Sequence, residues 1–177
     1  MEFRWPSSKT LPLCLSNVAM SFFLFSYQVH EKSILLPLLP ISLSMCRSSE
    51  LTYSRSIFNI SLLSMFPLLK KDGLSLPYWG LQLFSTTVHC LLSLDKKCQG
   101  FKWPRSKETF VDLLKEIIDS PIAVIISIVC MHLLCLFVQP LTSKEFLSDA
   151  IIVAFSFCYF LTQMILGNIC QYQACKQ

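Results

Sequence analysis

The sequence predicts an all-α protein, a polytopic bundle of helices embedded in a membrane. Of its 177 residues, 53% are hydrophobic, only 15% are charged and 14 are Phe, which is more apolar than is usual for a water-soluble domain. Several uncharged stretches reach the roughly 20 residues that a helix needs to cross about 30 Å of hydrocarbon. No internal repeat or low-complexity tract is visible, so we expect residues 1–177 to form a single membrane-embedded unit.

Six apolar segments are candidates for membrane-spanning helices. Four have the required length and contain no Asp, Glu, Lys or Arg: residues 11–29, 74–94, 120–143 and 150–170. Two more, residues 33–46 and 56–69, are also uncharged but fall short of the bilayer thickness. They are either re-entrant or extended by flanking polar residues. We therefore predict about six crossings.

The positive charges predict an orientation for these six crossings. Cytoplasmic loops accumulate Lys and Arg, and 11 of the 15 basic residues fall on one side of the predicted bundle, against 4 on the other. The larger group lies in the N-terminal segment, a loop predicted at residues 47–55, the 95–119 loop and the C-terminal tail. It comprises Arg4, Lys9, Arg47, Arg55, Lys96, Lys97, Lys102, Arg105, Lys107, Lys115 and Lys176. The 95–119 loop is therefore expected in the cytoplasm and the turn at 30–32 on the opposite, lumenal side.

The 95–119 loop is the longest hydrophilic segment, and its second half has helical periodicity. Apolar residues recur at intervals of three and four, which places them on one face of a helix: Phe110, Leu113, Leu114, Ile117 and Ile118. This pattern predicts a cytoplasmic basic loop with an amphipathic helix. The helix either lies on the membrane surface or leads into the next span.

The cysteines and the net charge exclude two classes of function. The nine Cys form no C-x-x-C pair and most lie inside apolar runs, as expected of packing residues rather than metal ligands. The net charge of +4 is concentrated beside the apolar segments, without a basic and aromatic platform. We therefore predict no metal, no cofactor and no nucleic-acid partner, with the lipid bilayer as the natural contact of the positive charge.

Few side chains have the pattern of a catalytic site. The sequence has no Gly-rich phosphate loop, no G-x-S-x-G and no H-E-x-x-H. His89 and His132 each stand alone in an apolar run and are expected to be hydrogen-bonded packing residues, although an ionisable residue in a membrane is also a site candidate. The sequon at Asn59 lies in an apolar segment, which predicts that it is not glycosylated.

The triplet His30, Glu31 and Lys32 stands between two strongly apolar runs, in the stretch SYQVHEKSILL. One interpretation is a tight lumenal turn in which Glu31 neutralises a Lys32 that extends toward the interface. The other is an anion site. An imidazole and an ammonium at the membrane boundary suit the phosphate of a lipid such as a polyprenyl phosphate.

Two stretches carry a resemblance to a known family. SFFLFSYQVHEKSILLPLLPISL (residues 21–43) and FNISLLSMFPLLKKD (residues 58–72) resemble the multispanning glucosyltransferases of the endoplasmic reticulum membrane that act in asparagine-linked glycosylation. Gln28 before Val-His-Glu-Lys is closer to the branch that adds the first glucose. From residue 95 onward the resemblance is general.

The resemblance implies a lumen-facing transferase of the GT-C type, with no metal and no nucleotide sugar. Such an enzyme takes glucose from dolichyl phosphate glucose and forms an alpha-1,3 bond to Man9GlcNAc2-diphosphodolichol, a dolichol-linked oligosaccharide. The resemblance also favours the anion-site interpretation, in which His30 and Lys32 bind the donor phosphate and Glu31 orients them.

The family members are several hundred residues long, and their catalytic acidic residue lies in an N-terminal lumenal loop without a counterpart here. We therefore expect this chain to be the C-terminal part of such an enzyme, inactive in isolation, with no assignable catalytic residue and with Met1 not necessarily the start of the biological polypeptide. The alternative is a non-catalytic membrane protein that scaffolds or modulates a full-length paralogue. A channel or transporter subunit is disfavoured because a polar intramembrane lining is missing from the sequence.

Overall fold

The computed structural model is helical throughout the residues it describes, which are 11–26, 31–44, 51–94, 118, 120–141 and 146–175. The all-α prediction is confirmed for these residues. Their elements are α1 (Leu11–Phe25), the 3-10 helix η1 (Glu31–Ile34), α2 (Leu35–Ser44), α3 (Leu51–Ser64), α4 (Phe66–Lys71), α5 (Ser75–Leu94), α7 (Pro121–Leu141) and α8 (Phe146–Cys175).

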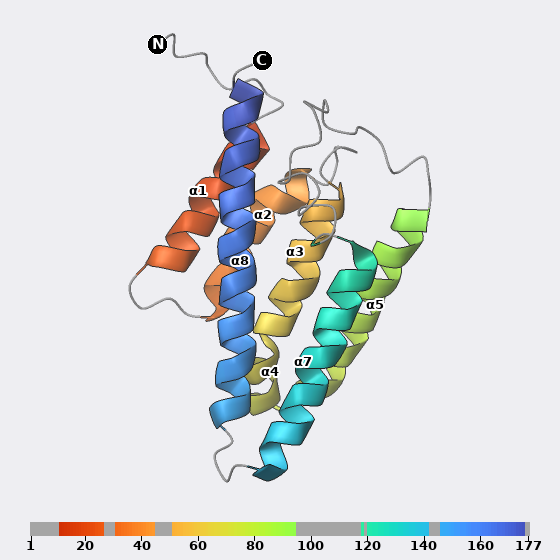
Figure 1. The fold of residues 1–177 in the computed structure, drawn as a ribbon. Helices are drawn as coiled ribbons and strands as arrows, with labels where there is room; N and C mark the ends of the chain where they lie inside the picture. Colours follow the sequence, from red (N-terminus) through yellow and green to blue (C-terminus); the bar gives the residue numbers. More distant parts are fainter. Residues whose placement is uncertain are drawn as a thin grey trace.

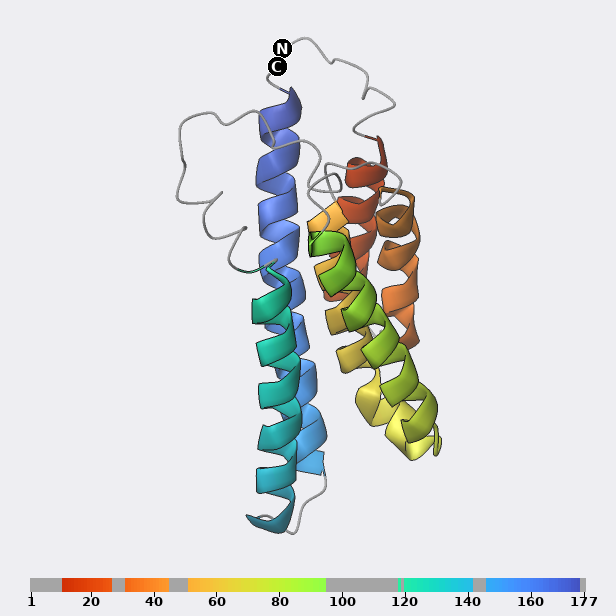
Figure 2. The ribbon, with the colours of Figure 1, turned by 90° about the vertical axis from the view of Figure 1, so that its right-hand side faces the viewer.

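The helices run alternately up and down in one bundle (Figure 1). α8 contacts α1, α3 and α7, and α5 packs against α3 and α7. Figure 2 shows α7 beside the lower part of α8, with which it is in contact, and in Figure 1 the two helices approach each other toward the lower end. The end of α5 and the start of α7 lie at the upper end of the bundle in Figure 1, whereas the α4–α5 turn and the facing ends of α7 and α8 lie at the lower end.

Proline and glycine set the helix boundaries at the lower end. α3 ends before Met65, and α4 follows directly with Pro67 in its first turn, where a missing N–H costs no helical hydrogen bond. Gly73 then adopts a φ of 73° in the turn between α4 and α5, a left-handed conformation that glycine adopts without steric strain. The chain therefore reverses within three residues.

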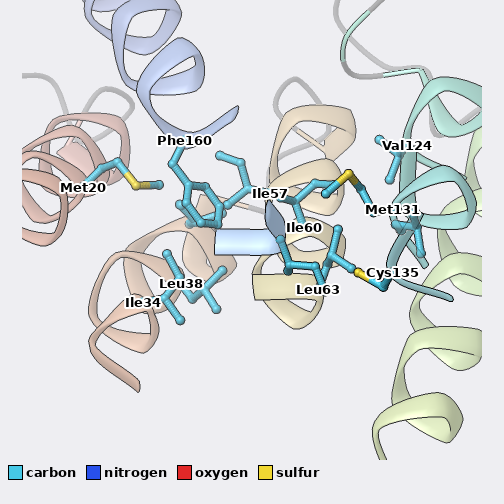
Figure 3. Packing of buried hydrophobic residues seen from close by; sticks show 13 residues of the cluster. Met20, Ile34, Leu38, Ile57, Ile60, Leu63, Val124, Met131, Cys135 and Phe160 are labelled. Atoms are coloured by element: carbon cyan, nitrogen blue, oxygen red, sulfur yellow. The ribbon is translucent and has the colours of Figure 1, made fainter. Parts of the chain in front are cut away.

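The core lies where α8, α3, α7 and the α1–α2 pair meet (Figure 3). Ile57, Ile60 and Leu63 of α3 are fully buried, and Phe160 of α8 packs edge-on against Phe23 with ring centroids 5.8 Å apart. Large apolar side chains also cover the outside of the bundle, including Leu76 at 84% exposed. An apolar exterior of this kind is suited to hydrocarbon rather than water.

Two helices in the described part of the chain are long and apolar enough to cross a membrane, at Pro121–Val138 and Phe146–Ile169. Cys14–Phe25 is a shorter apolar helix. The other predicted spans are shorter or carry more polar residues, as α5 does with Gln82 and His89. The count of six crossings stays a prediction.

One boundary prediction was wrong. We placed Arg55 in a loop at residues 47–55, but the structure places it inside α3 and only 5% exposed. The guanidinium is tolerated there because it faces a neighbouring helix rather than lipid. The predicted 95–119 loop, with its amphipathic helix, lies outside the described residues apart from Ile118.

Candidate functional site

The predicted donor-phosphate triplet lies at the connection between α1 and α2. The backbone of Glu31 and Lys32 forms the start of η1, which packs against both helices and is anchored by the fully buried Ile34. His30 and the side chains of Glu31 and Lys32 lie outside the described residues. Their predicted role therefore stays a prediction.

The described carboxylates do not supply a positioned base. Asp72 is exposed in the α4–α5 turn, and Asp149 is half-buried in the first turn of α8. Among the residues that the structure describes, no cluster of His, Cys, Asp and Glu has the arrangement of a metal site. No catalytic residue is assigned.

A buried polar network joins α3 to α5. Asn59 of α3 is fully buried, and its Nδ2 donates to the Arg55 carbonyl at 3.0 Å and lies 3.5 Å from Nδ1 of His89. Its Oδ1 accepts a hydrogen bond from Gln82 Nε2 at 3.3 Å. Arg55 also donates to the His89 carbonyl at 3.5 Å. Because an amide nitrogen only donates, the bond to His89 requires an unprotonated Nδ1.

This network confirms the expectation that His89 is a hydrogen-bonded packing residue. It also places Asn59, the predicted unused sequon, with its side chain buried inside a helix. The roles of Arg55 and Gln82 were not predicted, since their partners lie 34 and 23 residues away along the chain. The signal available in the sequence was that these polar residues interrupt two otherwise apolar segments.

His132 lies among three aromatic rings at the lower end of the bundle. The hydroxyl of Tyr78 and His132 Nε2 are 2.8 Å apart, and the imidazole is 4.6 Å from the Trp79 ring and 4.9 Å from the Phe66 ring, centroid to centroid. The predicted packing role of His132 is thus confirmed. The cluster fastens α4 and α5 to α7 with a combination of hydrogen bonding and edge-on ring contacts.

A third polar contact joins α1 to α8 near the upper end. Asn17 donates from Nδ2 to Gln171 Oε1 at 2.8 Å, and Gln171 donates from Nε2 to Cys14 Sγ at 2.9 Å. Gly167 lies directly opposite Asn17. A side chain at this position would separate the helices, so glycine permits their close approach.

These features define the class of protein: an all-helical bundle with an apolar exterior, helices long enough to cross a membrane and polar contacts between helices. Comparison with known proteins then gives the family. Residues 2–166 match the family model described as the ALG6, ALG8 glycosyltransferase family, and the chain belongs to that family.

Curated relatives agree with the family match. A Saccharomyces cerevisiae protein named dolichyl pyrophosphate Man9GlcNAc2 alpha-1,3-glucosyltransferase is 52% identical over 80 residues, covering 44% of this chain and 15% of the relative. A Gallus gallus protein of the same name is 50% identical over 74 residues, covering 41% of this chain and 14% of its own length.

The similarity also extends along most of the chain. An Arabidopsis thaliana protein named probable dolichyl pyrophosphate Man9GlcNAc2 alpha-1,3-glucosyltransferase is 34% identical over 178 residues, covering 94% of this chain and 30% of the relative. The chain thus spans less than a third of the length of these relatives. No solved structure gives a significant match.

Proposed function

We propose that this chain forms part of a lumen-facing GT-C type glucosyltransferase of the endoplasmic reticulum membrane. The enzyme transfers glucose from dolichyl phosphate glucose to Man9GlcNAc2-diphosphodolichol through an alpha-1,3 linkage, for protein N-glycosylation. The observation that carries this proposal is the family match over residues 2–166, with relatives of about 50% identity that are named for this activity.

The fold is consistent with a lipid-dependent enzyme in this proposal. Its apolar exterior and alternating helices suit a multi-pass bundle of six crossings. Both of the enzyme's substrates carry a dolichol chain that stays in the bilayer. The turn between α1 and α2 would then meet their polar groups at the lumenal boundary.

His30 and Lys32 bind the donor phosphate in this proposal, and Glu31 orients them. During transfer, an oxygen of the acceptor mannose bonds to C1 of glucose while the bond from C1 to the phosphate oxygen breaks. The electron pair leaves with dolichyl phosphate, and a cation beside that phosphate stabilises the developing charge. A base takes the proton of the acceptor hydroxyl, and we assign that role to no residue of this chain.

The second candidate is a non-catalytic membrane protein that scaffolds or modulates a full-length paralogue. The observation that favours it is that neither Asp72 nor Asp149, the two carboxylates whose side chains the structure describes, is positioned as a base.

Immunoblotting of microsomes with an antibody to residues 95–119 distinguishes the two candidates. The enzyme proposal predicts a band several times larger than the 20.3 kDa of this sequence, because the relatives are longer. A stable band near 20 kDa that copurifies with a full-length paralogue would favour the non-catalytic partner instead.

A further inference from the structure

A groove of about 380 Å³ runs between α5 and α7. On α5 its lining extends from Trp79 to Leu91, and Val129 contributes to it from α7. The volume lies within the range of roughly 300 to 1,000 Å³ that is usual for small-molecule sites, which are mostly apolar with a few polar groups.

The two threonines in the groove add little polarity to it. Thr86 Oγ1 donates toward the carbonyls of its own helix, at 2.8 Å from Gln82 O and 3.0 Å from Leu83 O. Thr87 Oγ1 donates to Leu83 O at 2.7 Å. Each hydroxyl hydrogen is thus used within α5, and the groove is left almost wholly apolar.

Gln82 is the exception, because its Oε1 is buried and has no hydrogen-bond partner in the described part of the chain. The polar network fixes its orientation. The Arg55 carbonyl accepts from Asn59 Nδ2, so Asn59 Oδ1 faces α5 and accepts from Gln82 Nε2. The amide of Gln82 therefore keeps an acceptor oxygen without a described partner, and a buried acceptor without a donor is unfavourable.

The depth of Gln82 indicates what kind of molecule would supply the donor. Trp is enriched at the level of the lipid headgroups, and Trp79 lies at the lower end of the groove, 42% exposed. Gln82 is one helical turn further in, about 4 to 5 Å at 1.5 Å per residue. From Gln82 to Leu91 the groove continues for roughly 14 Å, close to half of the ~30 Å hydrocarbon thickness.

We propose that this groove binds a neutral lipid alcohol of the sterol type. Its hydroxyl donates to Gln82 Oε1, and its hydrocarbon body lies along Thr86 and Thr87 toward Leu91. Gln82 is only 3% exposed, so the donor reaches Oε1 by inserting between α5 and α7. A polyisoprenol has the same hydroxyl but a chain much longer than one leaflet, so the groove depth favours the sterol.

The test uses the full chain in lipid nanodiscs with a photoreactive cholesterol. We expect mass spectrometry to find label on the groove residues of α5 and α7. Unlabelled cholesterol should compete about 3- to 10-fold better than its 3-methyl ether, which keeps the body but cannot donate a hydrogen bond. In Gln82→Leu the two competitors should become equivalent.

Two matched substitutions on α7 locate the site. Val129→Trp should abolish labelling because Val129 lines the groove, whereas Ile126→Trp, 56% exposed and outside the groove lining, should not. Equal competition by the methyl ether in the wild-type chain would overturn the proposal without relying on any variant. Uniform labelling of all lipid-facing helices, or stronger competition by a polyisoprenol, would overturn it as well.

Discussion

Asn59 joins α3 to α5 because both the nitrogen and the oxygen of its side-chain amide have hydrogen-bond partners, on its own helix and on α5. Its Nδ2 bonds to the Arg55 carbonyl and approaches His89, and its Oδ1 accepts from Gln82. In a low-dielectric interior, each of these hydrogen bonds that is lost leaves a further buried polar group without a partner, which is unfavourable. Removing one member therefore affects several residues at once.

Asn59→Leu should destabilise the bundle by about 1 to 3 kcal/mol, because it leaves buried donors and acceptors without partners. Asn168→Leu on α8 is the matched control, since Asn168 is exposed and donates to the Met164 carbonyl of its own helix. Unfolding in detergent, followed by circular dichroism, measures both variants. Equal stability of the two would contradict the structural role of the network.

The second residue-scale prediction concerns the donor site. In a full-length relative, alanine at the positions aligned with His30 and Lys32 should each raise the KM for dolichyl phosphate glucose roughly tenfold or more, the loss expected for a hydrogen bond to a charged group. Alanine at the position of Ser33 serves as the neighbouring control. Unchanged donor affinity and turnover in both variants would refute the phosphate assignment.

At the scale of elements, apolar length was enough to predict where helices occur but not where they begin. The segments at 74–94 and 120–143 became α5 and α7 with boundaries close to those expected. α3, in contrast, begins at Leu51, because Arg55 is accommodated by His89 on another helix. A charge that is satisfied by a distant partner resembles a loop residue when only its sequence neighbours are considered.

The close contact between α1 and α8 can be tested by adding a single methyl group at Gly167. A Cβ at Gly167 would clash with Asn17 Oδ1, and Asn17 is held by its bond to Gln171. Gly167→Ala should therefore force the helices apart and cost about 1 to 3 kcal/mol of stability.

Gly80→Ala in α5 is the control for Gly167→Ala. A Cβ there meets nothing within 4 Å, so only helix propensity changes, which favours Ala by up to about 1 kcal/mol. In thermal unfolding in detergent, Gly167→Ala should therefore have a lower midpoint temperature than the unmodified chain. Gly80→Ala should have the same midpoint or a higher one. The same response from both variants would exclude a steric role of Gly167.

The orientation of the helices can be tested with glycosylation tags. An acceptor sequon in a flexible insert after Asp72, in the α4–α5 turn, should be glycosylated in microsomes, because six crossings place that turn in the lumen. The same insert within residues 98–106 should remain unmodified in the cytoplasm. The reverse pattern would contradict the positive-charge argument.

At the scale of the whole molecule, the family and the helical class were accessible from sequence, whereas the contacts between helices were not. The motif around His30 is a short contiguous stretch, and the lengths of the apolar segments are read directly from the sequence, so both could be used for prediction. The links from Asn59 to Gln82, from Tyr78 to His132 and from Asn17 to Gln171 each join distant segments. They depend on which helices become neighbours.

We propose that this chain supplies part of the first-glucose transferase. The most direct test replaces the matching segment of the Arabidopsis thaliana relative with residues 2–166 and expresses the chimera in yeast lacking that activity. Chromatography of the lipid-linked oligosaccharides should show Glc1Man9GlcNAc2 with the chimera, and only Man9GlcNAc2 with the isolated chain. A chimera that reaches the membrane in normal amount but accumulates Man9GlcNAc2 would contradict the claim.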